Sequence, residues 1–537
     1  MAGTNRVKGA VRPPAWAARA KLRLAHVRGG PAEAAALIHR GQWDKAPAGL
    51  VPVGRYGIGF TDELAAAKID AVCLTWSPGF SLEGDVPQWE LIAKLLPLLK
   101  KKKIRVIAEF SLTGCFAAEL LPRVPEARSW LERRSDGKPI AHANENCLQM
   151  NVQHEGWRQY LAHKVRMAAG AGFDGFFFTD VVCQPADGAD FLAMLKEAAQ
   201  IGRIPETDDF LFYTDSVAPD VVRATNIKWV ASGARPPVDA QTFGANIPGL
   251  KALFELGGRD RTMVCGIPDA ATEKEARLAA AEVLACGGVC NGLRVPPRYR
   301  AFHAEHADIF AAADPVNTLA ILADDEGGSF ARLKSDLNLL DPLLRNAIQF
   351  DVIPISDFAS FDLRKYRVLS AMHIEKAPEP LDATLKAFAT HHGGAVLYSS
   401  AVPESEGSAE PTAPAPRTET PEGKGVTIRY TLPLRPETKQ LWLDDLHRLL
   451  QPPPVSIESG NLAVLVWGKG TRRWVHLLNY ASKPCDATIA LPGCGGRKLK
   501  VLSPDEKLPE LTILETGSAN ARFTIKNMDT YAVVEVE

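Results

Sequence analysis

The chain has 537 residues, of which 46% are apolar and 23% charged, and its formal net charge is −1. This length exceeds one ordinary hydrophobic core and predicts about two to four domains. The near-neutral charge argues against a protein that binds nucleic acid or an anionic membrane, because both classes usually carry a basic excess. No apolar run reaches the ~18 residues needed to span a bilayer, so we expect no membrane partner.

The first residues, 1–7, contain no apolar signal core, which predicts a cytoplasmic protein, or a secreted or periplasmic one if a signal peptide has been removed. The nine cysteines are scattered, and none forms a CxxC pair or a Cys/His cluster with zinc spacing. Cys73 and Cys265 lie in apolar runs, where small buried side chains are expected. We therefore expect no disulfide framework, no metal site and no cofactor.

Residues 1–312 alternate short apolar runs with helical patterns. The expected strands are 22–27, 71–76, 104–110, 175–180, 210–215, 227–230, 262–267 and 289–295. The expected helices are 61–68, 89–99, 154–169, 248–256, 272–286 and 301–312. Strands that alternate with helices build parallel sheets, so the pattern predicts a (β/α)8 TIM barrel. An open doubly wound sheet is the alternative, but no Gly-rich phosphate fingerprint follows any of these strands.

The stretch 170–181 organises this region. Gly170 and Gly172 suit the C-terminal cap of a helix, and the apolar run that follows has no polar alternation. A strand buried on both faces is typical of a parallel sheet, where the groups at its C-terminal end face the ligand side. Asp180, at that end, is therefore the first catalytic candidate.

Beyond residue 312 two smaller domains are expected. Residues 313–450 show an open α/β pattern, with strands near 318–323, 350–354, 367–370 and 395–398. Within it, the Pro-, Glu-, Ser- and Thr-rich segment 401–424 predicts a flexible surface loop. Residues 451–537 contain short alternating runs separated by turn residues, which predicts an antiparallel β-sandwich.

This order of domains resembles the three-domain β-galactosidases and related glycoside-hydrolase-like barrels. Two short motifs carry the resemblance. Asn-Cys-Leu-Gln-Met-Asn at 146–151, followed by a helix and Gly-Phe-Asp-Gly-Phe-Phe-Phe, resembles the fourth-strand region of fucosidase-like and amylase-like barrels. Val-His-Leu-Leu-Asn-Tyr at 475–480 is similar to the terminal domain of the β-galactosidases. The resemblance implies a glycosidase with a carbohydrate substrate.

The sequence departs from the family at the fourth strand. In those families the catalytic Asp lies five residues after the Asp of Asp-Gly, and here Thr179 occupies that position. Asp180 follows one residue later, and a one-residue slip normally turns a side chain to the other face of a strand unless a bulge restores it. No Asn-Glu pair ends this strand, so the chemistry of a retaining β-galactosidase is not supported.

Glycoside hydrolysis requires two carboxyl groups that flank the scissile bond. We expect Asp180 to act as nucleophile or base and Asp215 as general acid, with Glu109 as the substitute partner. Two of the three have a structural alternative: Asp215 can cap a following helix, and Glu109 can be a buried partner of Arg294. Neighbouring strand ends bring such carboxylates together in a barrel.

Further polar and aromatic residues are expected to bind substrate, namely His26, Trp76, Thr179, Asp269 and Arg294. His26 ends the first strand and can bond a sugar hydroxyl or be a core histidine. Trp76 can stack on a sugar ring or pack in the core. Asp269 can equally belong to a loop or cap the next helix.

Two functions from different classes remain open. The first is a glycoside hydrolase acting on an oligosaccharide or polysaccharide. The second is a non-catalytic carbohydrate-binding or scaffolding barrel, which Thr179 favours. The middle domain resembles a glutamine-amidotransferase-like fold, but 315–400 contains no Gly-x-Cys-x-Gly nucleophile motif. The resemblance implies that it assembles a homo-oligomer, a dimer or trimer.

Overall fold

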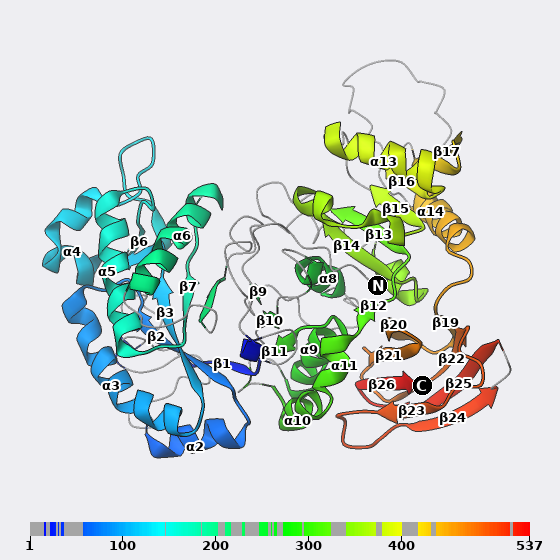
Figure 1. The fold of residues 1–537 in the computed structure, drawn as a ribbon, viewed down its shortest axis with the longest axis horizontal. Helices are drawn as coiled ribbons and strands as arrows, with labels where there is room; N and C mark the ends of the chain where they lie inside the picture. The colour runs from blue at the N-terminus through cyan, green and yellow to red at the C-terminus, as the bar shows by residue number, and fades with distance from the viewer. Residues whose placement is uncertain are drawn as a thin grey trace.

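A computed structural model shows how the chain is arranged in space (Figure 1). The structure describes residues 15–17, 22–27, 31, 34–36, 57–144, 146–183, 185–201, 210–215, 228–230, 246–255, 259, 262–265, 272–290, 292, 295–323, 340–371, 379–399, 417–430, 436–515 and 519–537. In Figure 1 the elements from α2 to α6 form one side of the molecule, and the middle sheet and the β-sandwich lie on the other side of α8–α11.

The N-terminal strands form two parallel sheets whose inner faces share one apolar cluster. The first sheet runs in the order β1 (Leu24–Val27), β2 (Ala71–Ser77), β3 (Arg105–Ser111), β7 (Gly175–Thr179) and β8 (Leu211–Thr214). The second contains β9 (Lys228–Val230), β10 (Met263–Cys265) and β11 (Val289–Cys290). Phe177 and Val264, from different sheets, belong to the same buried cluster. The amide of Gly292 donates a 2.7 Å hydrogen bond to the carbonyl of Leu24, which links the last strand to the first. These parallel strands confirm the barrel fold class.

Helices cover the outside of these strands. They are α2 (Ile58–Ala66), α3 (Leu82–Lys101), α5 (Glu155–Ala171), α6 (Pro185–Ile201), α8 (Ile247–Glu255), α9 (Glu273–Ala285), α10 (Pro297–Glu305) and α11 (Ala307–Ala312). The predicted capping box is present, since the side chains of Thr272 and Glu275 each accept a hydrogen bond from the other's backbone. Gly172 ends α5 in the left-handed region with φ 89°, as predicted. Helix α3 begins well before the predicted residue 89, because the hydroxyl of Ser81 caps it.

A segment between β3 and α5 was not predicted from the sequence. It contains β4 (Gly114–Phe116), α4 (Ala117–Arg123), a 3-10 helix (Pro125–Ser129), β5 (Ala141–Asn144) and β6 (Cys147–Gln149), with the strands antiparallel in the order β4-β6-β5. The indole of Trp157 on α5 donates a 2.9 Å hydrogen bond to the carbonyl of Leu112, which fixes the start of this segment beside the barrel.

The middle sheet is parallel except for its last strand. Its order is β14 (Phe350–Pro354), β13 (Leu319–Ala323), β15 (Val368–Ala371), β16 (Ala395–Ser399), β18 (Gly425–Tyr430) and β17 (Arg417–Glu422). Helices α13 (Glu379–His392) and α14 (Pro436–Leu449) accompany it. The prediction of a loop over 401–424 is wrong for 417–422, because β17 pairs antiparallel with β18, while 423–424 form the turn between them and 401–416 lie outside the described residues. Backbone hydrogen bonds to β18 hold this segment in a strand despite its polar composition.

The C-terminal strands form two antiparallel sheets packed over one apolar cluster, as expected for a sandwich. One sheet has the order β12 (Asp314–Pro315), β20 (Leu462–Lys469), β21 (Arg472–Asn479), β26 (Tyr531–Val536) and β23 (Leu499–Leu502). The other has β19 (Ser456–Ser459), β22 (Cys485–Pro492), β25 (Asn520–Met528) and β24 (Glu510–Glu515). Strand β12 precedes the whole middle sheet in the sequence but pairs with β20.

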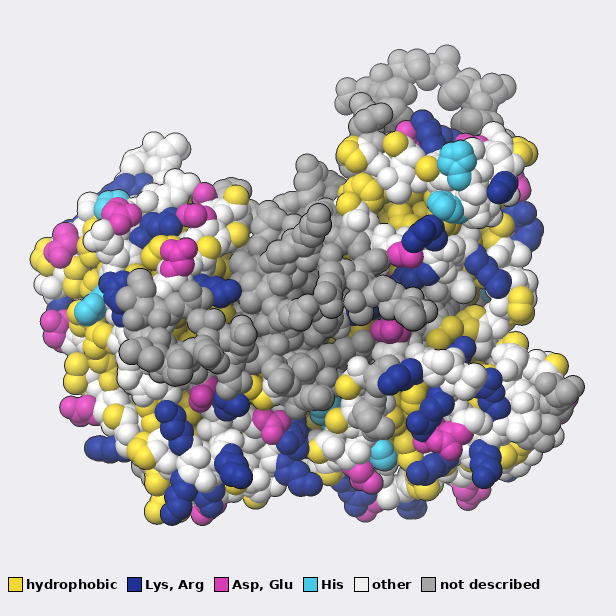
Figure 2. All heavy atoms as spheres, viewed as in Figure 1, with side chains coloured by type: hydrophobic (Ala, Val, Ile, Leu, Met, Phe, Trp, Pro, Cys, Tyr) yellow, Lys and Arg dark blue, Asp and Glu magenta, His cyan; other side chains and the backbone are white. Residues whose placement is uncertain are grey.

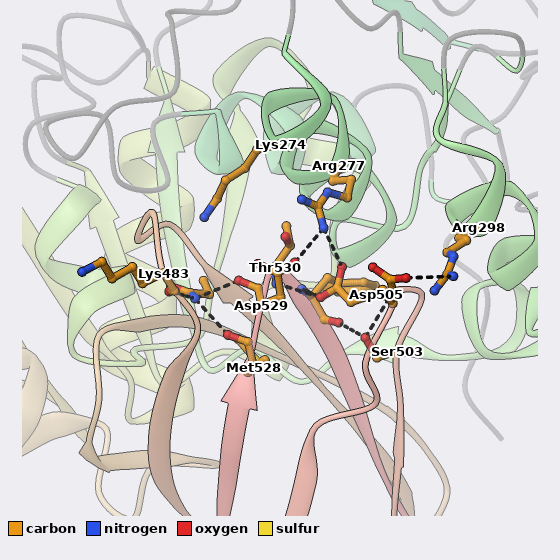
Figure 3. Close-up of polar contacts among 12 residues, drawn as sticks. Lys274, Arg277, Arg298, Lys483, Ser503, Asp505, Met528, Asp529 and Thr530 are labelled. Atoms are coloured by element: carbon orange, nitrogen blue, oxygen red, sulfur yellow. Dashed lines mark hydrogen bonds and ion pairs between the residues drawn. The ribbon is translucent and has the colours of Figure 1, made fainter.

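Polar contacts join the barrel helices to the sandwich (Figure 3). Arg277 of α9 points toward Asp529 and forms an ion pair of 2.7 Å with it. The hydroxyl of Tyr299 donates a 2.8 Å hydrogen bond to Asp505, whose other oxygen accepts from the amide of Thr530 at 2.7 Å. Because Asp505 is buried and fully engaged, these contacts fix the sandwich against α9 and α10.

The visible surface carries charges of both signs. On the face in Figure 2, basic and acidic side chains are interspersed over the described surface rather than gathered in a patch of one sign. Among the helices that the structure describes, none is both long and apolar enough to cross a lipid bilayer.

Candidate active site

Strand β7 delivers Asp180 to the carboxyl end of the barrel. Side chains alternate along the strand, so Phe176 and Phe178 pack against the helices and Phe177 faces the interior. Thr179 continues the inward series and ends the strand. Asp180 then adopts a left-handed backbone with φ 57°. Because of this backbone conformation, the Asp180 side chain does not follow the alternation of the strand. The register of β7 with β3 and with β8 contains no bulge.

The loop after β3 holds the Asp180 carboxylate. The hydroxyl of Ser111 donates a 2.8 Å hydrogen bond to Asp180 Oδ2, and the hydroxyl of Thr113 donates to the Asp180 carbonyl. Gly114 lies directly beside them. A Cβ atom at Gly114 would lie 2.7 Å from Ser111 Oγ and 3.3 Å from Asp180 Oδ2. Only a residue without a side chain leaves this hydrogen bond in place.

Asp215 lies next to Asp180, just after β8. Its amide donates a 3.1 Å hydrogen bond to the carbonyl of Phe178, which continues the parallel ladder. Its Oδ2 accepts a 3.0 Å hydrogen bond from the Asp180 amide. Burial, and secondarily the charge of Asp180, raise the pKa of Asp215 to about 7, although backbone hydrogen bonds to its carboxylate oppose this shift. Asp215 is therefore about half protonated at pH 7.

Two neighbouring carboxyl groups with different environments are the chemical requirement for glycosidic bond cleavage. One must donate a proton to the leaving oxygen, and the other must act ionised, as nucleophile or base. Asp215 fits the first role because its pKa is high, and Asp180 fits the second because a hydroxyl donor contacts its oxygen. The structure thus brings together two of the three predicted catalytic residues.

Glu109 and His26 belong to the interior of the barrel, on the strands beside β2. The hydroxyl of Thr75 donates a 3.4 Å hydrogen bond to Glu109 Oε2. His26 Nε2 lies 2.9 Å from the hydroxyl of Tyr213. Burial, followed by the charge of Glu109, raises the pKa of Cys73 well above its usual range. Among the described residues, His26, Cys73 and Glu109 form a group whose side-chain atoms are close enough together to hold a metal ion.

The remaining predicted substrate-binding residues are placed differently. Trp76 is buried in the layer between the barrel sheet and the helices, where its ring stacks on Trp89 at 4.9 Å. Trp76 faces the helices rather than the barrel interior, so it packs in the core, which was the alternative to stacking on a sugar ring. Thr179 lies at the site, and its hydroxyl donates a 3.2 Å hydrogen bond to the carbonyl of Phe110. Asp269 and Arg294 lie outside the described residues.

Sequence reasoning missed the loop residues that hold Asp180. The strand predicted from the sequence ends at residue 110, whereas Ser111 is the last residue of β3, Thr113 lies after it and Gly114 begins β4. Two hydroxyl residues and a glycine after a buried strand are a signal for a polar strand-end loop. Tyr213 lies within the predicted strand 210–215, and its hydroxyl is 2.9 Å from His26 Nε2 in the barrel interior.

No family model matches the chain, and no curated protein matches its sequence. Solved structures do match over almost the full length. A β-galactosidase from Bacillus circulans sp. alkalophilus has 11% identity and a TM-score of 0.67, with 97% of this chain and 100% of that chain covered. A catalytic mutant of a GH42 β-galactosidase from G. stearothermophilus has 12% identity and a TM-score of 0.65, covering 98% and 100%. A β-galactosidase from Rahnella sp. R3 has 10% identity and a TM-score of 0.65, covering 99% of each chain.

These likenesses bear on the fold alone, because the identities are low. Their coverage of almost the whole of both chains extends the likeness over all the sheets described above. The expected resemblance to the three-domain β-galactosidases is confirmed at this level. The chain has a glycoside-hydrolase-like three-domain fold similar to that of the GH42 β-galactosidases.

Proposed function

We propose that the protein is a glycoside hydrolase acting on an oligosaccharide or polysaccharide. Asp215 donates a proton to the glycosidic oxygen, and Asp180 attacks the anomeric carbon or activates a water molecule. The observation that carries this proposal is the direct contact between the two residues, in which the Asp180 amide bonds the Asp215 carboxyl group. Ser111 keeps the Asp180 carboxylate oriented through its hydroxyl donor.

The substrate is proposed to be a carbohydrate, and β-galactosides are the first compounds to test because the structural neighbours are named β-galactosidases. The two proposed carboxyl groups lie after the fourth and fifth barrel strands. Glu109 is the substitute partner in this proposal, since it lies on β3 and faces the same interior.

The domains proposed are a catalytic-type barrel at 1–312, an α/β domain at 313–450 and a sandwich at 451–537. We propose that the middle domain mediates a homo-oligomer, as the resemblance to the β-galactosidases implies. Size-exclusion chromatography with light scattering measures the assembly: a dimer or trimer supports this role, and a monomer at working concentration contradicts it.

The second candidate is a carbohydrate-binding barrel without hydrolytic activity. It is favoured by Thr179, which faces inward at the strand end where the related families carry a catalytic Asp. A hydroxyl at this position can bond a sugar but cannot act as nucleophile without an activating base.

The test is turnover of aryl glycosides and oligosaccharides by wild type, Asp180→Asn and Asp215→Asn. Hydrolysis by wild type and a fall in kcat on the order of 10²–10⁴-fold in each variant are the expected results. Asp190→Asn is the matched control, because that exposed carboxylate pairs with Arg158 on the outer helices. A wild type that binds a sugar but hydrolyses none supports the binding barrel instead.

A further inference from the structure

Three side chains of different ligand type meet inside the barrel on the adjacent strands β1, β2 and β3. They are His26, Cys73 and Glu109, and their nitrogen, sulfur and oxygen ligand atoms all lie within 4.8 Å of one another. His26 and Cys73 are direct partners in the parallel ladder. Glu109 pairs with Thr75, the next inward-facing residue on β2 after Cys73. The strand register therefore brings all three groups to one point.

Cys73 is completely buried in this group, whereas His26 and Glu109 are half-buried. Cys73 and Tyr213 have no exposed surface, and both belong to the buried cluster of the barrel interior. The ring of Phe177 lies edge-on to the imidazole of His26 at 4.6 Å. A carboxylate and a sulfur anion can share such a space at low cost when a cation lies between them.

We propose that His26, Cys73 and Glu109 bind one divalent transition-metal ion of the zinc class. Imidazole nitrogen, thiolate sulfur and carboxylate oxygen are the three ligand types that Zn²⁺ accepts, whereas Mg²⁺ and Ca²⁺ select oxygen alone. On binding, the Cys73 thiol loses its S–H proton to solvent and the sulfur bonds the metal ion. Three protein ligands leave a fourth position of the tetrahedron for water.

Two further hydroxyl groups orient the ligands. The Tyr213 hydroxyl lies 2.9 Å from His26 Nε2, and a histidine has two ring nitrogens, so this contact and a metal bond can coexist. The Thr75 hydroxyl contacts Glu109 Oε2 at 3.4 Å. Thr75 lies on β2, as Cys73 does, and Tyr213 lies on β8, two strands beyond β3 in the sheet. Such hydrogen-bonding partners fix the direction of a ligand.

The site shares no residue with the proposed pair Asp180 and Asp215, and a Glu109 bound to metal is no longer available as the substitute partner. Its test therefore needs no enzyme assay. The purified full-length chain is freed of metal with a chelator and titrated with Co²⁺, which substitutes for Zn²⁺ and gives a near-ultraviolet charge-transfer absorption when a thiolate binds it. One equivalent of Co²⁺ with this absorption is expected, and Zn²⁺ should displace it.

Single variants identify the ligands. Cys73→Ser should remove the charge-transfer absorption, whereas Cys265→Ser, which changes another completely buried cysteine in β10, should retain it. Glu109→Gln and Tyr213→Phe should each weaken Co²⁺ affinity by roughly 10-fold or more. If circular dichroism shows that Cys73→Ser does not fold, the Co²⁺ affinity of Glu109→Gln tests the proposal instead. Absence of the absorption in wild type, its persistence in Cys73→Ser, or unchanged affinity in Glu109→Gln would overturn the proposal.

Discussion

The backbone amide of Asp180 donates a 3.0 Å hydrogen bond to the carboxyl group of Asp215. The contact joins the ends of β7 and β8, which are paired in parallel. The hydrogen bond itself lowers the pKa of Asp215, but burial and then the negative charge of Asp180 outweigh it and raise that pKa, so the two carboxyl groups are electrostatically coupled.

The pH profile of activity should show Asp215 acting as an acid. Because its pKa is about 7, kcat/KM should fall about tenfold per pH unit on the alkaline side of that value. In Asp180→Asn the neighbouring charge is absent, so the alkaline limb of any residual activity should shift to lower pH. Rates on an aryl glycoside from pH 4 to 10 measure both. If the alkaline limb of the pH profile lies at the same pH in Asp180→Asn and wild type, Asp215 is not the general acid.

Stability should also depend on Asp215. Its pKa lies above the ordinary 3.8, so its protonated form stabilises the fold fully below that pH, and this contribution disappears as pH rises through about 7. Asp215→Asn should therefore be more stable than wild type above pH 7, by up to about 4 kcal/mol, with the gain shrinking toward pH 4. Urea unfolding at several pH values measures the difference. A gain that is independent of pH would contradict the raised pKa.

Gly114→Ala should damage the site without damaging the fold as a whole. The new methyl group would displace the Ser111 hydroxyl from Asp180, so we expect kcat to fall by at least tenfold with a small change in KM. Gly170→Ala is the matched control, because a Cβ at that helical position meets nothing within 4 Å. Equal activity in both variants would show that Ser111 does not orient Asp180.

A buried ion pair supports the end of β2 and should be essential for stability. Lys164 and Asp85 lie 2.7 Å apart with 1% and 0% exposure of their side chains, and Lys164 also donates to the hydroxyl of Ser77. Lys164→Met leaves Asp85 buried without its cation, so the free energy of unfolding should fall by about 3–5 kcal/mol.

The control for this pair is Lys386→Met, which breaks an exposed pair with Asp382 on α13 and should cost about 0–1 kcal/mol. The double variant Lys164→Met with Asp85→Leu should recover part of the loss, because neither charge is then buried alone. Chemical denaturation of the variants decides between these values. Equal losses at the two pairs would contradict the argument from burial.

The periodic parts of the fold were predictable from the sequence, and the local loop chemistry was not. The apolar run at 175–180 and the capping box at Thr272 identified the fourth strand and α9, because both depend on neighbours in sequence. Strand β17 was missed because its ladder to β18 compensates for a polar composition. The domain limits at 312 and 450 remain predictions.

For the candidate site, the sequence placed the carboxylates but not their orientation. Asp180 and Asp215 were identifiable because strand ends carry the ligand-facing groups of a barrel. The left-handed backbone of Asp180 and its contact with Ser111 depend on a loop from another strand, which periodicity does not encode. Trp76 was misassigned as a candidate for sugar stacking for a related reason, because the face that an aromatic residue occupies depends on register.

Strand β12 has a consequence for how the chain is made. It pairs with β20, although the entire middle sheet lies between them in sequence. During synthesis, β12 leaves the ribosome long before its partner strand exists, and the middle sheet is completed in the interval. The sandwich is therefore the last part to form, and its formation pairs β12, just after the barrel, with a strand that is synthesised after the middle sheet. A ribosome stalled before residue 462 would carry the sequence of the barrel and the middle sheet with β12 still unpaired.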